Sequence, residues 1–348
     1  MRFSVIVPTF DRAEPVVRAI DSALAAGAAE VIVVDDASTD RTQAVLEERY
    51  GANLRVRAIR LETNAGPSVA RNRGLAAADG DAVLFLDSDD ALAPGAFAFA
   101  AAAFEAVPAL RFLTLEGESQ ALGSDRVDRG IVRGACPGWT GPGFDPGRFV
   151  TVPLTVAGAA ASLLVGDCLP AIVYGDLFYL SGLIVRRETA LAAGPFDPRL
   201  RYLEDWDFTA RMCLQGIGGH LDAPGFRRET ARPDQLSRVD SQSRRAVMHQ
   251  RVLRHLHAVA RPRRALRTVL RKAQAEADYW LARCLDRAGH PRLARGYFLR
   301  SLRARHKIHK CLVLLLLGMP LLRRPAGTRT GATPTDSGGS GEDSVESV

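Results

Sequence analysis

Three carboxylates lie within four residues in Asp87-Ser88-Asp89-Asp90, directly after the apolar run 82–86. Carboxylates this close repel one another unless a cation is present, and hard divalent cations take oxygen ligands together with substrate phosphates. A D-x-D triplet by itself also fits a solvated acidic turn. Its position at the end of an apolar strand favours a metal site.

A second acidic group, Glu204-Asp205-Trp206-Asp207, opens a predicted helix. Acidic residues stabilise a helix N-terminus through the helix dipole, which accounts for Glu204 and Asp207. A carboxylate at such a position, beside a metal and a diphosphate, is also where a general base for an acceptor hydroxyl is needed. The segment is therefore a candidate for acid–base chemistry.

Two further polar segments follow the first two predicted strands. The first strand ends in Pro8-Thr9-Phe10-Asp11, where Asp11 alone could simply cap the next helix. Asp35 and Asp36 end the second strand, and an Asp at such a strand end can accept hydrogen bonds from a ribose or a base. Two adjacent carboxylates exceed what a helix cap requires, so we expect Asp36 to contact a ligand.

Residues 64–74 place a Gly-Pro turn before a helix, with Arg71 near the start of that helix. An arginine there suits a phosphate or a nucleobase. Asn64 and Ser68 also have structural explanations, as a turn residue and an N-cap. No G-x-G-x-x-G follows the first strand, which removes the main support for a dinucleotide-dependent dehydrogenase.

These segments lie between strands and helices that alternate along the chain. Apolar, β-branched runs of this kind suit a parallel sheet covered on both faces, and the order implies a doubly wound open sheet with ligands at the carboxyl ends of its strands. Residues 115–170 are rich in Gly and Pro and predict an irregular insertion, with one strand or helix within 152–165. The predicted strands are 3–8, 31–34, 54–60, 82–86 and 178–185, and the predicted helices are 14–26, 42–50, 68–78, 187–193 and one from 204.

In this order, P-T-F-D-R, V-D-D-A-S-T-D, N-A-G-P-S-V-A-R-N-R-G, F-L-D-S-D-D, G-P-F-D and E-D-W-D resemble the motifs of family 2 glycosyltransferases over about residues 1–240. The resemblance implies the α/β GT-A fold, with a doubly wound, mostly parallel sheet and flanking helices. It also implies an inverting hexosyltransferase-type enzyme (EC 2.4) that uses a nucleotide-sugar donor and a Mg²⁺ or Mn²⁺ ion bridging the donor diphosphate to the D-x-D. The resemblance alone favours a UDP-sugar.

The resemblance assigns roles to individual residues. Asp205 becomes the general base, and Asp87 and Asp89 become the metal ligands. We expect Glu204 and Trp206 near the acceptor, with the Trp206 indole stacked on a sugar face. The residues expected to hold the donor are Pro8, Thr9, Phe10, Asp11, Asp36, Arg71, Asp87, Ser88 and Arg232.

One segment departs from the family pattern. Near the diphosphate the family often has a histidine before a proline, whereas residues 231–237 present Arg232. An arginine can pair with the diphosphate but cannot ligate a metal, so direct metal contact is not expected from this segment. Further acceptor contacts are expected from residues 115–170, because loops vary freely on a fixed scaffold.

Charge divides the chain into an acidic body and a basic extension. Residues 1–243 hold 24 Lys and Arg against 32 Asp and Glu, whereas residues 244–310 hold 19 against 3. We predict a catalytic domain over 1–243, a basic α-helical extension over 244–310, an apolar segment at 311–324 and a disordered tail over 325–348. Within the extension, spacing fits one tetratricopeptide-like hairpin, although an ordinary helical hairpin packed on the catalytic domain is the simpler interpretation.

The basic extension favours polyanions. With the leucine-rich run 312–317 it predicts peripheral binding to an anionic membrane surface, and burial of that run as a helix is the alternative. The extension has few aromatic residues for base stacking, so no nucleic-acid partner is expected. No apolar run reaches the ~20 residues that cross a bilayer. With no export signal and no C-x-x-C pair among the five cysteines, we expect a cytoplasmic protein, placed peripherally at the inner face of the membrane.

The main hypothesis is an enzyme of cell-envelope polysaccharide biosynthesis, acting on a glycan or lipid-linked acceptor. Two alternatives from other classes are a catalytically silent scaffold that binds a partner through its helical tail, and a nucleotidyltransferase. The intact Asp89 and Asp205 argue against the first, and the E-D-W-D segment argues against the second.

Overall fold

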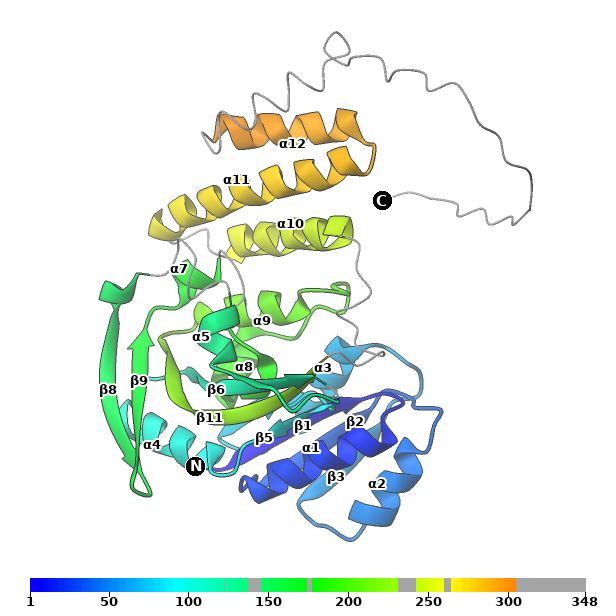
Figure 1. The fold of residues 1–348 in the computed structure, drawn as a ribbon. Coiled ribbons are helices and arrows are strands. Elements are labelled where there is room, and N and C mark those ends of the chain that lie inside the picture. Colours follow the sequence, from blue (N-terminus) through cyan, green and yellow to red (C-terminus); the bar gives the residue numbers. More distant parts are fainter. Residues whose placement is uncertain (122, 137–144, 174–176, 231–241, 260–263, 305–348) are drawn as a thin grey trace, which may run out of the picture.

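The computed structural model describes residues 1–121, 123–136, 145–173, 177–230, 242–259 and 264–304. A mixed sheet with flanking helices forms the body of the molecule, and three helices are stacked on one end of it (Figure 1). Within the described residues, eleven strands form one sheet, with the order β3-β2-β1-β4-β10-β6-β11-β9-β8 along its main path.

The first half of the sheet is parallel, as the alternating sequence predicts. β1 pairs in parallel with β2 and β4, and β2 pairs in parallel with β3. β1, β4 and nearly all of β2 are buried, because their side chains are apolar on both faces. The elements of this half are β1 (Phe3–Thr9), α1 (Ala13–Ala25), β2 (Glu30–Asp35), α2 (Thr42–Tyr50), β3 (Val56–Arg60), α3 (Pro67–Ala77) and β4 (Ala82–Phe85).

The second half departs from a mostly parallel sheet. β10 runs antiparallel to both β4 and β6, β11 runs parallel to β6, and β9 runs antiparallel to both β11 and β8. The α/β class with flanking helices is confirmed, but the sheet is mixed. The elements are β5 (Asp90–Leu92), α4 (Ala96–Ala106), β6 (Phe112–Ala121), β10 (Leu183–Arg186), α8 (Arg187–Ala193), α9 (Glu204–Cys213) and β11 (Gly218–Thr230).

The prediction that residues 115–170 form an irregular insertion was wrong, whereas a strand, one of the two alternatives expected within 152–165, is present. A long hairpin occupies much of the segment, and its turn holds Ala157 at φ 48° and Gly158 at φ 83°, the left-handed backbone that two-residue hairpins need. The hairpin is half exposed, so its sequence carries little of the hydrophobic periodicity that reveals a buried strand. The elements are β7 (Val127–Arg129), α5 (Ile131–Ala135), β8 (Phe149–Val156), β9 (Ala159–Gly166) and α7 (Leu169–Ile172).

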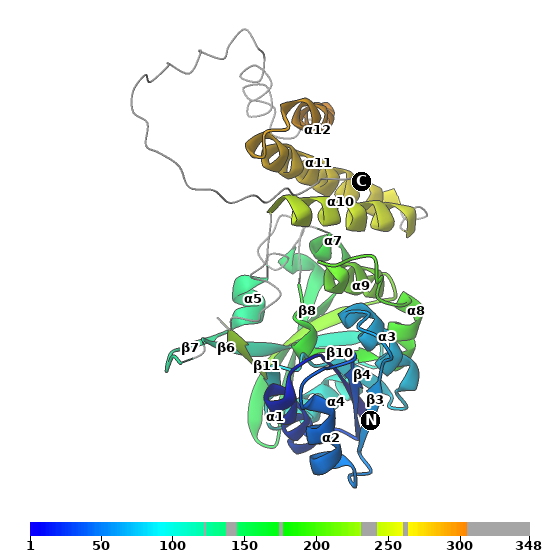
Figure 2. The same ribbon diagram turned by 90° about the vertical axis from the view of Figure 1, so that its right-hand side faces the viewer.

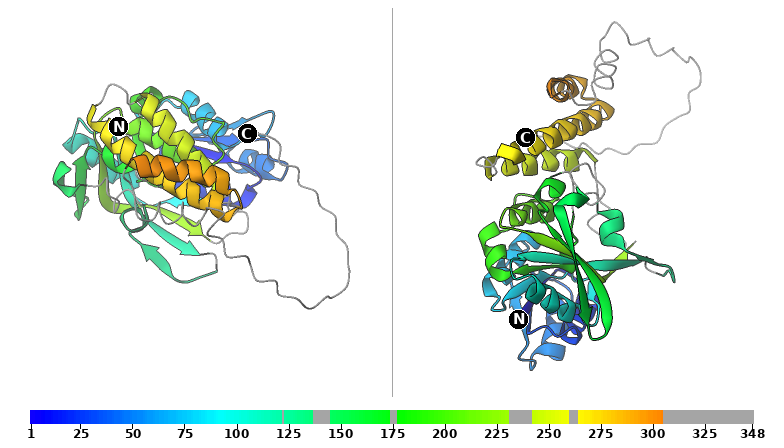
Figure 3. Two further views of the ribbon diagram at one scale, coloured as in Figure 1. Left: turned by 90° about the horizontal axis from the view of Figure 1, so that it is seen from above. Right: turned by 90° about the vertical axis from the view of Figure 1, so that its left-hand side faces the viewer.

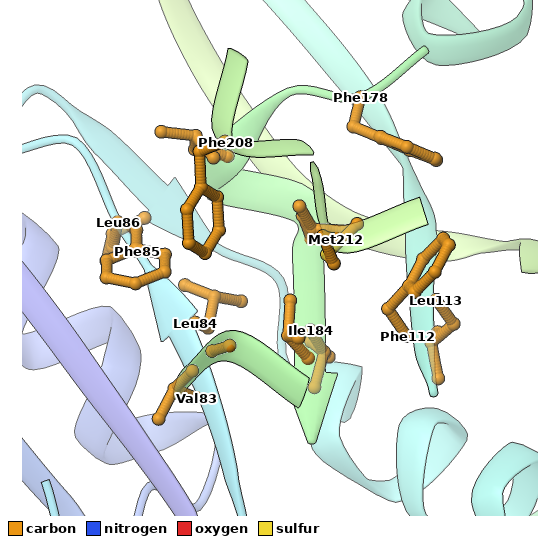
Figure 4. Packing of buried hydrophobic residues seen from close by; sticks show 14 of the residues in the cluster. Val83, Leu84, Phe85, Leu86, Phe112, Leu113, Phe178, Ile184, Phe208 and Met212 are labelled. Carbon is orange, nitrogen blue, oxygen red and sulfur yellow. The ribbon is translucent and has the colours of Figure 1, made fainter. Parts of the chain in front are cut away.

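Helix α9 packs on the middle of the sheet. Figure 4 shows Phe208 and Met212 of this helix beside side chains of β4 and β10. The Phe208 ring meets the Phe85 ring edge-on at 5.7 Å between centroids and stacks on Phe196 at 4.1 Å. Because Phe85 is the last residue of β4, this packing brings the start of α9 to the carboxyl end of the strand.

The C-terminal helices are layered on α9. α10 (Gln242–Val259) packs on α9, α11 (Arg264–Arg287) packs on α10, and α12 (Pro291–Arg303) packs on α11, as Figures 2 and 3 also show. The buried core of the sheet continues into α10 and α11 through Val252, Leu253, Leu256, Leu270, Ala273 and Ala277.

The helical hairpin expected in the extension is formed by α11 and α12. Gly289 turns the chain between them at φ 83°, and Tyr279, Ala282, Ala294 and Phe298 pack together across the pair. The hairpin packs on α10 through α11. In the part of the chain that the structure describes, no helix combines the length and apolarity needed to cross a membrane. The predicted apolar segment 311–324 and tail lie outside the described residues.

Candidate active site

The polar segments meet because parallel strands end at the same edge of the sheet. Thr9 at the end of β1 pairs with Asp35 at the end of β2, and the Asp36 N–H donates to the Thr9 carbonyl over 2.9 Å. The N–H of Leu86, just beyond β4, donates to the Ile6 carbonyl of β1 over 2.9 Å. The D-x-D that follows Leu86 is therefore held beside the ends of β1 and β2.

Arg71 of α3 joins two of the segments directly. Its Nη2 donates to Asp87 Oδ1 and its Nη1 donates to Glu204 Oε1, both over 3.0 Å, while the guanidinium lies 5.5 Å from the centre of the Phe196 ring. Burial opposes the charge, but Asp87 and Glu204 hold the pKa of Arg71 above its usual value. A charged arginine therefore ties the end of β4 to the first turn of α9.

The two carboxyls at the start of α9 share this one arginine. Burial and the neighbouring Asp205 together raise the pKa of Glu204 to about 7, although Arg71 opposes the shift. Burial also raises the pKa of Asp205, while Arg71 and the Trp206 N–H, which donates to Asp205 Oδ1 over 2.7 Å, oppose the increase. Carboxyls whose pKa values are raised in this way suit proton transfer near neutral pH.

The three carboxylates of the D-x-D segment have different environments. Asp87 is 43% exposed, and Asp89 pairs with Arg12 at 2.5 Å. Asp90 points inward, where it accepts a 2.5 Å hydrogen bond from the Ser181 hydroxyl and burial raises its pKa well above the usual value. Asp90 is thus part of the core, and Asp87 and Asp89 remain as the two carboxylates at the edge.

These carboxylates fit a cation that also binds substrate. Among the described residues, no group of three or more His, Cys, Asp and Glu is arranged to hold a metal ion by itself. Two carboxylates suffice where substrate phosphates and water supply the remaining ligands, as is usual for Mg²⁺. The residues present therefore fit a shared metal site and not one built entirely from protein.

The segments at the ends of β1 and β2 are closely interlocked. The Asp36 carboxylate is 4% exposed and accepts hydrogen bonds from the Ala65 and Gly66 N–H groups, each over 2.8 Å. Gly66 has φ 86°, a left-handed backbone that favours glycine at the turn into α3. Asp36 thus shapes this turn, and only its remaining lone pairs are open to a nucleoside.

Thr9 and Asp11 lie beside this turn. The Thr9 hydroxyl oxygen is buried and has no hydrogen-bond partner within the described residues. Asp11 does not cap α1, which begins after Arg12 without a side-chain cap. Its Oδ1 instead accepts from the Thr39 N–H over 2.6 Å. The Phe10 ring is 40% exposed, whereas Pro8 and Ser88 are buried.

Two site predictions need further comment. Trp206 was expected to stack on an acceptor sugar, but its side chain is 3% exposed and its Nε1–H donates to the Ile172 carbonyl over 2.6 Å. That expectation was wrong, because the indole is part of the core. Arg232 lies outside the described residues.

Two other contacts at the site were not predicted from the sequence. Asn72 exchanges two hydrogen bonds with the Phe196 backbone, at 2.9 Å and 2.8 Å, which fixes the G-P-F-D turn against α3. Arg12 pairs with Asp89. Both residues lie within the quoted motifs, so the signal was present, but the sequence could not show their partners. Beside Asp89 lies a pocket of about 380 Å³, whose polar lining includes Arg18, Gln120, Arg227, Arg228 and Glu229.

Known proteins share this architecture. Residues 4–110 match the family described as glycosyl transferase family 2. The succinoglycan biosynthesis protein ExoO of Rhizobium meliloti is 42% identical over 122 residues, which cover 33% of this chain and 34% of ExoO. The poly(ribitol-phosphate) beta-N-acetylglucosaminyltransferase TarS of Staphylococcus aureus is 42% identical over 95 residues, which cover 26% of this chain and 16% of TarS. The matches thus span about a third or less of these relatives.

Solved structures resemble this fold over a larger part of the chain than the sequence matches cover. TarS residues 1–349 in complex with UDP-GlcNAc superpose with a TM-score of 0.52 at 20% identity, covering 91% of this chain and 89% of that one. GalNAc-T7 with UDP, GalNAc and Mn²⁺ gives a TM-score of 0.51 at 14% identity, over 73% of this chain and 48% of that one. Residues 4–110, about a third of the chain, thus match glycosyl transferase family 2, and the solved structures show a similar fold over a larger part of the chain.

Proposed function

We propose that this protein is an inverting glycosyltransferase that moves a sugar from a nucleoside-diphosphate sugar to a hydroxyl group of a glycan or lipid-linked acceptor. The observation that carries the proposal is the Arg71 bridge, which joins the D-x-D at the end of β4 to the acidic start of α9. The bridge brings together a candidate site for a cation that also binds the donor diphosphate and a candidate general base. Sugar transfer from a nucleoside-diphosphate sugar requires both.

The donor is a UDP-sugar. TarS was solved with UDP-GlcNAc and GalNAc-T7 with UDP, which supports this nucleotide for a chain of the same fold. The nucleoside would lie over the ends of β1 and β2, where the buried Thr9 hydroxyl lacks a partner within the described residues. The exposed Phe10 ring beside it suits stacking on a base.

A divalent cation would be held by Asp87 and Asp89 together with the donor diphosphate, and the Mn²⁺ in the GalNAc-T7 structure supports its use. When bound, the ion neutralises the charge that develops on the departing nucleoside diphosphate. Arg71 hydrogen-bonds Asp87 and so keeps one of these carboxylates aimed at the edge of the sheet. Asp89 would exchange its Arg12 partner for this role.

Asp205 takes the proton from the acceptor hydroxyl. The acceptor oxygen then attacks the anomeric carbon from the face opposite the leaving diphosphate, which inverts the configuration without a covalent enzyme intermediate. Asp205 shares Arg71 with Glu204 and, by its own negative charge, favours the protonated form of Glu204. Glu204 and Asp205 therefore gain and lose protons as an interacting pair.

The acceptor approaches from the side of β6 and β11. The pocket beside Asp89 includes Gln120, Ala121 and Gly123, which belong to the segment expected to contact the acceptor. The names of ExoO, TarS and the teichuronic acid enzyme TuaG of Bacillus subtilis all refer to surface polysaccharides or envelope polymers. We propose a role in making such a polymer, with the protein bound peripherally at the inner face of the membrane.

Binding of UDP with and without Mn²⁺ tests this proposal. A ligand at a hundredfold excess over its Kd stabilises the folded state by ~2.7 kcal/mol, so thermal unfolding should shift to higher temperature with UDP, and further with Mn²⁺ present. Asp89→Asn should abolish the Mn²⁺-dependent part of the shift in unfolding temperature. Asp222→Asn, which changes an exposed residue of β11, should preserve that part. If no nucleoside diphosphate produces a metal-dependent shift in the wild-type protein, the proposal is wrong.

A further inference from the structure

The first turn of α9 carries both Glu204 and Asp205, yet it begins from an unfavourable backbone. Leu203, the residue before the helix, has φ 63° and ψ 20°, a left-handed conformation that is unfavourable for an ordinary side chain. Such a conformation persists only where the surrounding structure holds it in place. Contacts from neighbouring elements must therefore fix this turn.

One of these contacts comes from the C-terminal extension. His255 of α10 donates through Nδ1 to Asp207 Oδ1 over 2.8 Å, and the Asp207 side chain is completely buried. The second carboxylate oxygen of Asp207 accepts from Arg211 Nε over 2.9 Å. Arg211 in turn donates to the carbonyls of Ala193 and Pro195, at the turn that precedes α9. Asp207 thus links the extension to α9 and, through Arg211, to the beginning of the segment that leads into α9.

A second contact lies on the neighbouring residue. The His249 ring of α10 meets the Trp206 ring edge-on, with 4.6 Å between centroids, while the Trp206 Nε1–H is held by Ile172 of α7. Burial lowers the pKa of His249 to about 4, so this ring is neutral and packs as an apolar group. Trp206 and Asp207, the two residues that follow Asp205, are both held by α10.

We propose that α10 positions the general base. His255, acting through Asp207, and His249, acting through Trp206, fix the first turn of α9 so that Glu204 and Asp205 face Arg71. The basic extension is then part of the catalytic unit and not only an appendage that carries charge. This inference rests on the proposed function, because it takes Asp205 to be the base.

Three substitutions on α10 test the proposal. His255→Ala removes the hydrogen bond to Asp207, whereas His255→Asn retains a donor at the same distance from the backbone, because Asn Nδ2 occupies the place of His Nδ1. Arg254→Ala changes an exposed neighbour on the same helix. We expect His255→Ala to lower kcat about tenfold to a hundredfold, since small misplacements of catalytic groups have effects of this size. The donor KM should change little, and His255→Asn and Arg254→Ala should retain most of the activity.

A readout independent of turnover separates positioning from general stability. Amide hydrogen exchange should become faster in the first turn of α9, residues 204–208, in His255→Ala, but not in His255→Asn and not in β1 of any variant. If kcat and exchange in α9 are unchanged in His255→Ala, or if His255→Asn behaves like His255→Ala, the positioning role is wrong. If the wild-type protein does not transfer sugar at all, the proposed function fails, whereas the exchange experiment still tests the contact.

Discussion

Asp205 lies close to the carboxylate of Asp87 and to the charged Arg71, which makes its removal informative. Asp205→Asn preserves the size of the side chain and removes the base, while Asp87, Asp89 and Arg71 remain in place. We expect kcat to fall by about 100-fold or more, the usual contribution of a general base, with UDP affinity preserved. Steady-state transfer kinetics and UDP titration measure the two effects. Turnover close to the wild-type value would refute the base assignment, and Asp222→Asn is the surface control.

The raised pKa of Glu204 makes a prediction about stability and pH. The carboxyl changes from a usual pKa of 4.5 to about 7 on folding, so between these values the folded state binds more protons than the unfolded state. Stability is therefore lost as pH rises through this window. Glu204→Gln removes the free-energy cost of ionising this buried carboxyl and retains an oxygen that accepts a hydrogen bond from Arg71. We expect this variant to be more stable than wild type above pH 7, by up to about 3 kcal/mol, with the difference disappearing toward pH 4.5.

Denaturant unfolding at several pH values measures this difference. A constant difference between Glu204→Gln and wild type across the pH range would show that Glu204 does not titrate as described.

Close approach of helix and strand positions Arg71. Gly74, one turn after Arg71 on α3, faces β1, and a Cβ built there would overlap Ile6 Cγ2. The helix therefore lies closer to the strand than any other residue would allow. Gly296 on α12 has no heavy atom within 4 Å of such a Cβ. The two glycines form a matched pair, because both lie inside helices.

Gly74→Ala and Gly296→Ala should have opposite effects. The first forces α3 away from β1 and should destabilise the protein by about 1–3 kcal/mol. The second should stabilise it by roughly 0.5–1 kcal/mol, because alanine loses less backbone freedom on folding. Gly74→Ala should also weaken UDP binding, since Arg71 moves with α3. Equal stability of the two variants would mean that α3 can shift without cost.

At the scale of the whole molecule, the acidic body carries a basic outer helix. α12 contains four arginines and no acidic residue, and its Leu293 and Leu299 are 60% and 40% exposed. Each basic side chain near an anionic lipid surface contributes ~1 kcal/mol of attraction. Because the buried core runs from the sheet into α10 and α11, deleting the extension would expose apolar surface. Charge substitutions in the full chain are therefore the better test of membrane binding.

We expect the triple variant Arg292→Gln, Arg295→Gln and Arg303→Gln to bind anionic lipid vesicles about tenfold more weakly or worse than wild type. Added salt should weaken vesicle binding by the wild-type protein similarly. The matched control replaces three exposed arginines of the body, Arg41, Arg55 and Arg126, by glutamine and so changes the net charge equally. Co-sedimentation with anionic and neutral vesicles measures the effect. Equal binding by the two triple variants would exclude a specific role for α12, and no binding to either lipid would exclude the membrane proposal.

Local sequence patterns predicted the alternating first half of the sheet, the order of motifs that resemble family 2 glycosyltransferases, and the helix bounds at 42–50 and 187–193. Local signals suffice there, because continuous apolar runs, turn residues and helical spacing are set within a few residues of one another. For the half-exposed hairpin of β8 and β9, the sequence predicted only one strand or helix within 152–165, since the alternation of apolar residues is weak there.

Only the tertiary structure decided which charges meet. Arg71 and Glu204 are 133 positions apart, and His255 lies 48 positions from Asp207. No local pattern encodes such pairs, because they depend on how α9 packs across the sheet and how α10 packs on α9. The same packing buries Trp206, which its sequence context placed at a sugar, and it makes the basic extension part of the core. The sequence thus selected the residue types for the chemistry, and long-range packing decided their partners, because burial and contact are properties of the assembled fold.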